Sequence, residues 1–544
     1  MKIEGNIIDI HQRRIYGGEI TVENEVIKNI VENKKTYKTY ISPGFIDAHV
    51  HIESSMLKPE QFSQLVIQKG TVAIINDPHE IANVLGIEGI RYMLQHAEKS
   101  LIKMFFTIPS CVPSTSFDYS GGHIGVAEVE DLARSGKFIA LSEVMDVPGV
   151  LGRDPELSEK LDIAKRYHLK IDGHAPGLSG EGLIFYIDKG ISTDHECTHI
   201  EEAREKIHHG MKILIREGSA AKNYEALSDL ISEFPDQVMF CTDDSHPGEL
   251  FQEGHIDKIV RRAIAEGYDF FDVLKIACLN PIFHYGLQIG TLQIGDQADF
   301  VVFEDINSFQ VKEVYIGGKK KWENQMEWIG KTNVMNEPKE KVYLNRFECL
   351  PIVPEDLVKK VKEKIVCIGV INGEIITRKI VFEFSDTLDN LESDRERDIL
   401  KLVYMNRYTR SLPQIAFIHG VGLKKGAFAT SISHDSHNII AVGCNDEDLS
   451  KAINRVIEEK GGLVMIDGKE EIILPLPIAG IMTDRKTEEV IEKWEDLIEK
   501  LKMRGCSLDS PFMTLSFMSL LVIPELKIGE KGLFEFAKFA FLEY

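Results

Sequence analysis

The sequence predicts an α/β protein built on a TIM-type (β/α)8 barrel, with a small β-domain from both flanks and an additional C-terminal α/β domain. Eight short β-rich runs alternate with helical stretches over roughly 250 residues, the number and size typical of such a barrel. The runs are apolar throughout, as expected for parallel strands buried on both faces. A doubly wound open sheet is the alternative, but eight units exceed its usual size. The runs are residues 43–52, 70–77, 101–110, 137–145, 169–175, 190–196, 211–219 and 238–244.

The regions that flank the barrel at 43–288 have a different texture. Residues 1–42 and 289–325 consist of short alternating bursts, such as Glu19–Val22 and Gly290–Phe303, separated by polar turns. This pattern predicts antiparallel strands, and we expect the two stretches to form one small β-sandwich-like domain. Charge-rich residues 326–352 indicate a linker. Residues 353–544 predict a separate α/β domain, including a charged amphipathic helix around 487–503.

Composition narrows the possible partners and compartments. The 544 residues carry a formal net charge of −23, which disfavours nucleic acid and anionic membranes and favours a neutral or cationic small substrate. No apolar stretch approaches the ~20 residues of a membrane span. Eight dispersed cysteines without a C-x-x-C pair indicate neither a disulfide framework nor a zinc knuckle. The N-terminus lacks the features of a signal peptide, so we expect a cytoplasmic protein.

The first barrel run ends with two histidines, His49 and His51, separated by a single valine. Residues i and i+2 of a strand point to the same face, so both imidazoles are expected to converge on one point. Such a pair can bind a metal ion. Alone it is also consistent with two ordinary polar residues at a strand end, and the later runs decide between these interpretations.

Other titratable residues end the later runs. Functional sites of parallel barrels form where the carboxyl ends of the strands meet, so these side chains should share one edge. Imidazoles and carboxylates are ligands of divalent metals, and four histidines with two carboxylates suffice for two ions, with Glu143 as a possible bridge. Two metals sharing a water would supply hydroxide at neutral pH, which predicts hydrolysis or hydrolytic deamination. The residues are Asp77, His79, Glu143, His174, His195, Asp243 and Asp244.

Some polar residues near these ends have simpler interpretations. His199, His208 and His209 lie on a helix-like stretch and are expected at the surface or behind the ligands. Asp243 ends the last run and is favoured as ligand and general base, whereas the side chain of Asp244 should point the opposite way. Asp77 precedes Pro78 and could instead be a helix N-cap.

Several motifs together resemble the amidohydrolase superfamily, and within it the adenine deaminase branch. The resemblance spans nearly the whole chain, because segments after residue 400 resemble the extra domain of that branch. It implies a metallo-hydrolase barrel in which Glu143 takes the place of the carbamylated lysine found in several relatives. The motifs are Pro43–His51, His51–Ser55, Asn76–Asn83, Ser142–Gly149, Asp172–Pro176, Thr193–Glu196, Ile215–Ala221, Cys241–Pro247, His419–Gly422 and Ser433–Ile439.

The resemblance also implies a reaction and a set of roles. The reaction is hydrolysis of adenine to hypoxanthine and ammonia in purine salvage, with two divalent metal ions, manganese ahead of iron. Asp243 would take a proton from the nucleophile and pass it toward the departing amine. Asp77, Asp244 and Ser245 are candidates for binding the purine ring. Glu80 and Glu217 are further candidate proton donors. The metal ligands would be His49, His51, Glu143, His174, His195 and Asp243.

Two alternative functions stay open at this point. One is another amidohydrolase that acts on a cyclic amide or an N-acyl substrate with the same metal set. The other is a non-catalytic metal-binding sensor, although the six predicted ligands, Asp243 among them, argue against it. We expect a homo-oligomer, a dimer. His434 and His437 could bind a further metal, but a loop cluster at a domain interface is the preferred interpretation.

Overall fold

The computed structural model describes residues 1–324, 343–385 and 387–542. Each of the eight predicted runs contains one strand, and all eight strands run parallel within two sheets. The first sheet has the order β5-β6-β7-β8-β9 and the second has the order β10-β11-β12. The strands are β5 (Phe45–Val50), β6 (Thr71–Asn76), β7 (Lys103–Ile108), β8 (Phe138–Val144), β9 (Lys170–Gly173), β10 (Thr193–Asp194), β11 (Lys212–Arg216) and β12 (Val238–Cys241).

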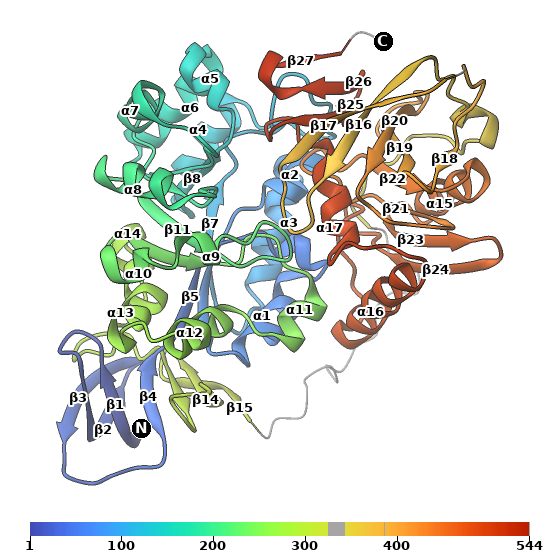
Figure 1. The fold of residues 1–544 in the computed structure, drawn as a ribbon. Helices are drawn as coiled ribbons and strands as arrows, with labels where there is room; N and C mark the ends of the chain where they lie inside the picture. Colours follow the sequence, from blue (N-terminus) through green and yellow to red (C-terminus); the bar gives the residue numbers. More distant parts are fainter. Residues whose placement is uncertain (325–342, 386, 543–544) are drawn as a thin grey trace.

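The two sheets meet at both edges. Val50 and Asp243 form a parallel bridge between the ends of β5 and β12. On the other side, the backbone N–H of Ser192, just before β10, donates to the carbonyl of Ile171 in β9 at 2.9 Å. These contacts give the strands a TIM-like arrangement, with helices packed around them (Figure 1).

Helices follow the barrel strands and supply the outer layer of this region. They bring the carboxyl ends of all eight strands to one end of the molecule, where the predicted site residues follow. The helices are α1 (Pro59–Ile67), α2 (His79–Leu85), α3 (Ile87–Ala97), α4 (Val126–Arg134), α5 (Val147–Gly152), α6 (Pro155–Arg166), α7 (Gly180–Asp188), α8 (Ile200–His208), α9 (Tyr224–Leu227), α10 (Leu230–Glu233), α11 (Pro247–Gln252), α12 (Ile256–Ala265), α13 (Phe270–Leu274) and α14 (Asn280–Tyr285).

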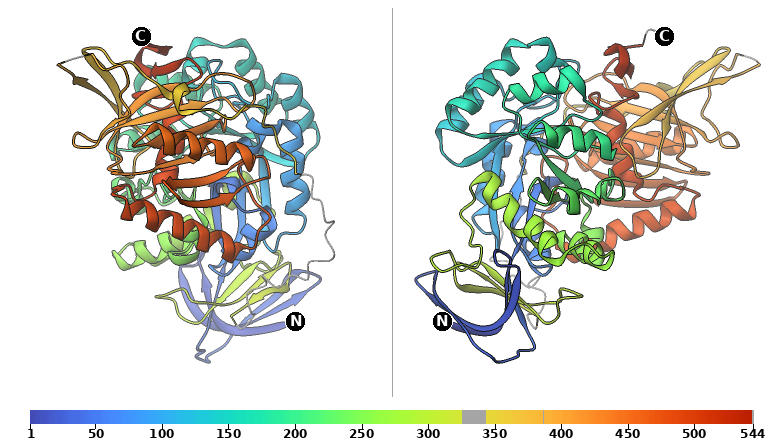
Figure 2. Two further views of the ribbon diagram at one scale, coloured as in Figure 1. Left: turned by 90° about the vertical axis from the view of Figure 1, so that its right-hand side faces the viewer. Right: turned by 60° about the vertical axis from the view of Figure 1, so that its left-hand side comes forward.

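Strands from both flanks of the barrel form one seven-stranded sheet at its base (Figure 2). Its order is β15-β14-β13-β4-β1-β2-β3, so the two flanks pair where β13 meets β4. The predicted strand character of Gly290–Phe303 is confirmed only for its last four residues: the Asp296 carboxylate accepts the N–H of Thr291 at 2.7 Å and fixes a turn, and β13 begins at Phe300. The strands are β1 (Lys2–Asp9), β2 (Arg14–Glu23), β3 (Val26–Glu32), β4 (Tyr40–Pro43), β13 (Phe300–Phe303), β14 (Val311–Ile316) and β15 (Lys319–Glu323).

The C-terminal region contains a nine-stranded, mostly antiparallel sheet and two long helices. The helix expected around 487–503 is confirmed as α16, and residues 326–342 of the predicted linker lie outside the described residues. The domain boundaries stay a prediction. The elements are β16 (Lys364–Val370), β17 (Thr377–Glu383), β18 (Ser393–Asp394), β19 (Ile399–Met405), β20 (Gln414–His419), β21 (Ala427–Thr430), β22 (Ile439–Gly443), α15 (Asp446–Glu458), β23 (Gly462–Asp467), β24 (Glu470–Pro475), α16 (Thr487–Met503), α17 (Pro511–Ser516), β25 (Leu526–Gly529), β26 (Gly532–Glu535) and β27 (Ala540–Phe541).

This C-terminal region packs directly on the barrel (Figures 1 and 2). Trp494 of α16 lies so close to Gly248 of α11 that a Cβ at this glycine would collide with the indole. Ser510, just before α17, donates to the Glu249 carboxylate at 2.9 Å. The contacts hold the C-terminal region over the carboxyl end of the barrel. Within the described residues, no helix is long and apolar enough to cross a membrane.

Candidate metal centre and active site

Glu143, at the end of β8, lies between two pairs of histidines. Its Oε1 is 3.3 Å from Nε2 of His51 and 3.6 Å from Nε2 of His49. Its Oε2 is 2.6 Å from Nδ1 of His174 and 3.3 Å from Nε2 of His195. One carboxylate oxygen therefore faces each pair, which is the arrangement that a bridging ligand of two ions requires.

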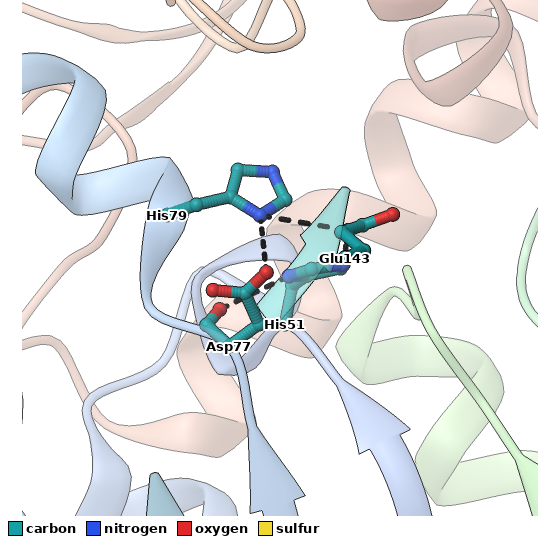
Figure 3. A group of neighbouring side chains, drawn as sticks. All are labelled: His51, Asp77, His79 and Glu143. Carbon is teal, nitrogen blue, oxygen red and sulfur yellow. Dashed lines mark hydrogen bonds and ion pairs between the residues drawn. The ribbon is translucent and has the colours of Figure 1, made fainter. Parts of the chain in front are cut away.

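His49 and His51 point to the same side of β5, and their ring centroids are 4.7 Å apart. The Nδ1 of His51 is 3.0 Å from the carbonyl of Asp77. If Nδ1–H donates to this carbonyl, Nε2 is free to act as a ligand atom and faces Glu143. Metal-binding histidines commonly donate their second ring N–H to a carbonyl or carboxylate in this way. Figure 3 shows this convergence of His51 and Glu143.

Asp243 follows β12 and faces the first histidine pair. Its Oδ1 is 3.0 Å from Nε2 of His51 and 3.3 Å from Nε2 of His49. Its Oδ2 accepts a hydrogen bond from Nη1 of Arg216 at 2.7 Å. Burial would raise the pKa of Asp243, but Arg216 and the histidines hold it well below the ordinary value. The carboxylate therefore stays ionised.

The expectation that Asp244 points away from Asp243 is wrong. Asp243 has a φ of 56°, in the left-handed region, so the alternation of an extended strand does not continue through it. Ligand atoms of His51, Asp243 and Asp244 consequently lie within 4.8 Å of one another. Burial raises the pKa of Asp244, and it accepts a short hydrogen bond from the Ser54 hydroxyl.

Asp77 pairs with a neighbouring histidine and makes no N-cap bond. Its Oδ2 is 2.8 Å from Nδ1 of His79, whereas α2 begins at His79 without a side-chain cap. Asp77, His79, His51 and Glu143 place ligand atoms within 4.8 Å of one another, from β6, α2, β5 and β8 (Figure 3). His79, one of the titratable residues that end the runs, is thus part of the cluster, although the six predicted metal ligands do not include it.

Two other predicted contacts lie away from this cluster. A central cavity is lined by cluster residues that include His51, Glu143 and Asp243. The Ser245 hydroxyl donates to the carbonyl of Thr242 at 3.4 Å, and Ser245 does not line this cavity. Glu217 does not line the cavity either, and its Oε2 lies 3.9 Å from Nη1 of Arg262. The expected surface histidines His199, His208 and His209 are exposed.

Glu196 and Arg216 form a buried pair that the sequence prediction missed. Both side chains are about 3% exposed, and the guanidinium donates to both Glu196 oxygens as well as to Asp243. Oε1 of Glu196 is 3.4 Å from Nε2 of His195. The sequence contains a signal for both residues, because Glu196 directly follows the predicted ligand His195 and Arg216 is the last residue of β11.

The C-terminal region contributes side chains that the sequence alone does not place at the site. His434, Asp435 and Phe517 line the central cavity together with barrel residues. The Nδ1 of His434 is 2.6 Å from Oε1 of Glu80, and Nε2 of His437 forms a short ion pair with Oε2 of the same carboxylate. These two histidines lie at the contact between the barrel and the C-terminal region, as the preferred interpretation expects.

The donor set fits divalent metal ions. Nε2 of His49 and Nε2 of His174 are buried and have no hydrogen-bond partner within the described residues. Burial would raise the pKa of Glu143, but His195, His174 and His49 hold it well below its ordinary value. Ionised carboxylates next to imidazole nitrogens without partners are the chemistry of a borderline metal site.

Comparison with known proteins places the chain in a family. The Amidohydrolase family matches residues 40–321 and the adenine deaminase C-terminal domain matches residues 374–540. An adenine deaminase from Methanosarcina mazei is 47% identical over 100% of this chain and 99% of its own. This chain belongs to the adenine deaminase family of amidohydrolases. The adenine deaminases of Sulfurovum sp. and Borreliella afzelii are each 46% identical, again over 100% of this chain and 99% of their own.

Membership in this family agrees with the donor set, because amidohydrolases bind divalent metals. A more distant solved structure, 5-methylcytosine deaminase from Klebsiella pneumoniae liganded with 5-fluorocytosine, is 13% identical. It covers 60% of this chain and 98% of its own, with a TM-score of 0.46.

Proposed function

We propose that this chain hydrolyses adenine to hypoxanthine and ammonia, using two divalent metal ions, manganese in preference to iron. The observation that carries the proposal is the position of Glu143, with one oxygen toward His49 and His51 and the other toward His174 and His195. Curated relatives that match the whole chain are named adenine deaminases.

Six residues would hold the two ions. His49, His51 and Asp243 face one side of Glu143, and His174 and His195 face the other. Bound ions would supply Lewis acidity that lowers the pKa of water and makes it a nucleophile at neutral pH. Arg216 keeps Asp243 ionised and in place through Oδ2, so that Oδ1 stays directed at the histidines.

Asp243 is the proposed general base. It is ionised, buried and directed toward the ligand cluster, so it can take a proton from water and pass it to the exocyclic amine as ammonia leaves. The ring must also receive a proton when C6 is attacked. Asp244 suits this role because burial raises its pKa, so it retains its proton to higher pH than an ordinary aspartate.

Asp77 and Glu80 complete the proposed contacts to the purine. Oδ1 of Asp77 is buried without a hydrogen-bond partner within the described residues, so it can accept an N–H of the ring. Glu80 lines the cavity and is held ionised by His434, against the effect of burial. An ionised carboxylate accepts hydrogen bonds, so Glu80 would accept one from the exocyclic amine of adenine.

The C-terminal region would act as the cover of the site. Barrel residues together with His434, Asp435, Phe517 and Leu520 line a cavity of about 20 Å³. This space holds about one water molecule. Adenine binding therefore requires these side chains to move apart, and their return would exclude water from the reaction.

The test compares substrates of the two hydrolase classes. Metal-stripped protein, before and after addition of manganese, is incubated with adenine and, in parallel, with dihydroorotate. The proposal expects a manganese-dependent loss of adenine absorbance and no turnover of the cyclic amide. Turnover of dihydroorotate without turnover of adenine would replace the deaminase assignment by the amidase alternative.

A further inference from the structure

A second cavity lies at the opposite end of the barrel strands from the metal cluster. Its volume is about 570 Å³, and Lys170 and Lys212 line it. Lys170 is the first residue of β9 and Lys212 the first of β11, whereas His174 and Arg216 lie at the other ends of these strands. Four residues of strand separate the two ends by about 13 Å. The cavity is therefore distinct from the proposed active site.

Positive charge collects in this cavity although the whole chain carries a net charge of −23. Lys170 is exposed, and no carboxylate of the described residues forms an ion pair with it. The Lys212 ammonium donates to uncharged oxygens, the Asp236 carbonyl at 2.8 Å and the Gln237 amide at 3.2 Å. Lys275 pairs with the Asp236 carboxylate. Three ammonium groups thus face one carboxylate.

A buried polar atom in the cavity wall also lacks a partner. His284 is only 7% exposed and lines the cavity, and its Nε2 makes no hydrogen bond within the described residues. Burial, with Lys170 and Lys212, lowers the pKa of His284 to about 3, so the ring is neutral at physiological pH. A neutral imidazole with a free nitrogen can donate to or accept from a ligand without opposing the lysines.

Aromatic side chains line the same cavity beside the charged groups. Phe283 is 62% exposed, and the centroid of its ring lies 6.3 Å from that of His11. An exposed ring beside a cationic cluster can stack on a planar base while the ammonium groups bind a phosphate. The cavity volume exceeds what a phosphate ion alone fills and lies within the range of ligand pockets.

We propose that this cavity is a second binding site, for a phosphorylated ligand of nucleoside monophosphate size. Lys170 and Lys212 bind the phosphate, His284 supplies a hydrogen bond from the wall, and Phe283 packs on the base. Arg13 does not contribute charge, because Asp269 at 2.6 Å and Asp272 already neutralise it. The site does not depend on the deaminase assignment, because none of its residues belongs to the metal cluster.

The test measures binding to the full-length protein by calorimetry with three probes: AMP, adenosine and inorganic phosphate. The variants are Lys170→Gln and Lys212→Gln, with Lys137→Gln as the control, because Lys137 is an exposed lysine directly before β8 that does not line the cavity. AMP should bind more tightly than either other probe. Each cavity variant should weaken AMP binding about tenfold or more, the usual effect of losing a charged hydrogen bond. Lys137→Gln should bind like the unmodified chain.

Three results would overturn the proposal. Equal affinities for adenosine and AMP would show that the site does not recognise the phosphate. Equal affinities for inorganic phosphate and AMP would show that it does not recognise the base. AMP binding that is unchanged in both cavity variants would place AMP elsewhere, for example in the active site. Unchanged melting temperatures of the variants confirm that a loss of binding does not reflect unfolding.

Discussion

The Nδ1 atom of His434 lies 2.6 Å from Oε1 of Glu80, and this pair connects the C-terminal region to the barrel inside the active site. Both side chains are buried, at 1% and 2% exposure. Burial alone would lower the pKa of His434, but the carboxylates of Glu80 and Asp244 raise it to about 9. The imidazole is therefore charged at neutral pH and keeps Glu80 ionised. The C-terminal region thus sets the charge of a carboxylate that lines the central cavity.

This pair should show strong energetic coupling. His434→Leu leaves the Glu80 carboxylate buried with less compensation, which typically destabilises a protein by about 3–5 kcal/mol. In a Glu80→Gln background the same change should have a much smaller effect, because the carboxylate is already absent. Denaturant unfolding of the four variants of this cycle measures the difference. Additive effects would mean that the contact contributes nothing to docking of the C-terminal region.

Asp243→Asn should reduce turnover of adenine by about 10²–10⁴-fold, the usual contribution of a general acid–base group. The amide cannot take a proton from water, although it keeps the shape of the carboxylate. Steady-state kinetics at neutral pH check this, with metal content measured on the same samples. Asp154→Asn, which changes an N-cap of α6 far from the cluster, is the matched control. Near-normal turnover of Asp243→Asn would move the base to Asp244.

The enzyme should act on the free base and reject the nucleoside. Adenine binding already requires the side chains that line the cavity to move apart, and a ribose at N9 of adenine would require still more space. A steric clash of this kind should reduce kcat/KM for adenosine well below that for adenine. Comparing the two substrates at equal concentration measures this. Comparable kcat/KM values would mean that the site opens toward N9.

Lys527 should make the stability of the protein depend on pH. It is wholly buried, its ammonium donates to the carbonyls of Ile375 at 2.6 Å and Phe517 at 2.9 Å, and burial lowers its pKa to about 7. Between about pH 7 and the ordinary lysine value of 10.5, the unfolded chain binds this proton and the folded chain does not. The free energy of unfolding therefore rises with pH across this range.

Replacing this lysine should remove that dependence. Lys527→Met changes the free energy of unfolding relative to the unmodified chain, and this change should be more stabilising at pH 7 than at pH 9.5 by about 3 kcal/mol. Denaturant unfolding of both proteins at the two pH values tests this, with exposed Lys531→Met as the control. An equal difference at both pH values would show that Lys527 titrates normally in the folded chain.

Much of the metal cluster could be predicted because it follows from strand ends. Apolar runs identify the barrel strands, and parallel strands bring their carboxyl ends together, so His49, Glu143 and His174 converge without any further information. The left-handed conformation of Asp243 marks the limit of this reasoning. Alternation along a strand predicts that the Asp244 side chain points away from the cluster. The φ of 56° at Asp243 breaks this alternation, so Asp244 lies on the same side as Asp243.

The contribution of the C-terminal region could not be predicted for a different reason. Glu80 and His434 are 354 residues apart, and their contact depends on how the C-terminal region packs on the barrel. No local pattern encodes that geometry. The cluster His434–His437 is visible in the sequence, but its partner is not. Arg216 differs, because its two carboxylate partners, Glu196 and Asp243, follow β10 and β12 of the same barrel.

The central claim is that Glu143 bridges two ions that the hydrolysis of adenine requires. The most direct test counts metal ions per chain and ammonia released from adenine, in the unmodified protein and in Glu143→Gln after reconstitution with manganese. Exposed Glu181→Gln, at the start of α7, is the control. We predict about two ions per chain and equal amounts of ammonia and hypoxanthine in the unmodified and control proteins, and a loss of both metal and ammonia release in Glu143→Gln. Full metal occupancy and undiminished ammonia release in Glu143→Gln would contradict the claim.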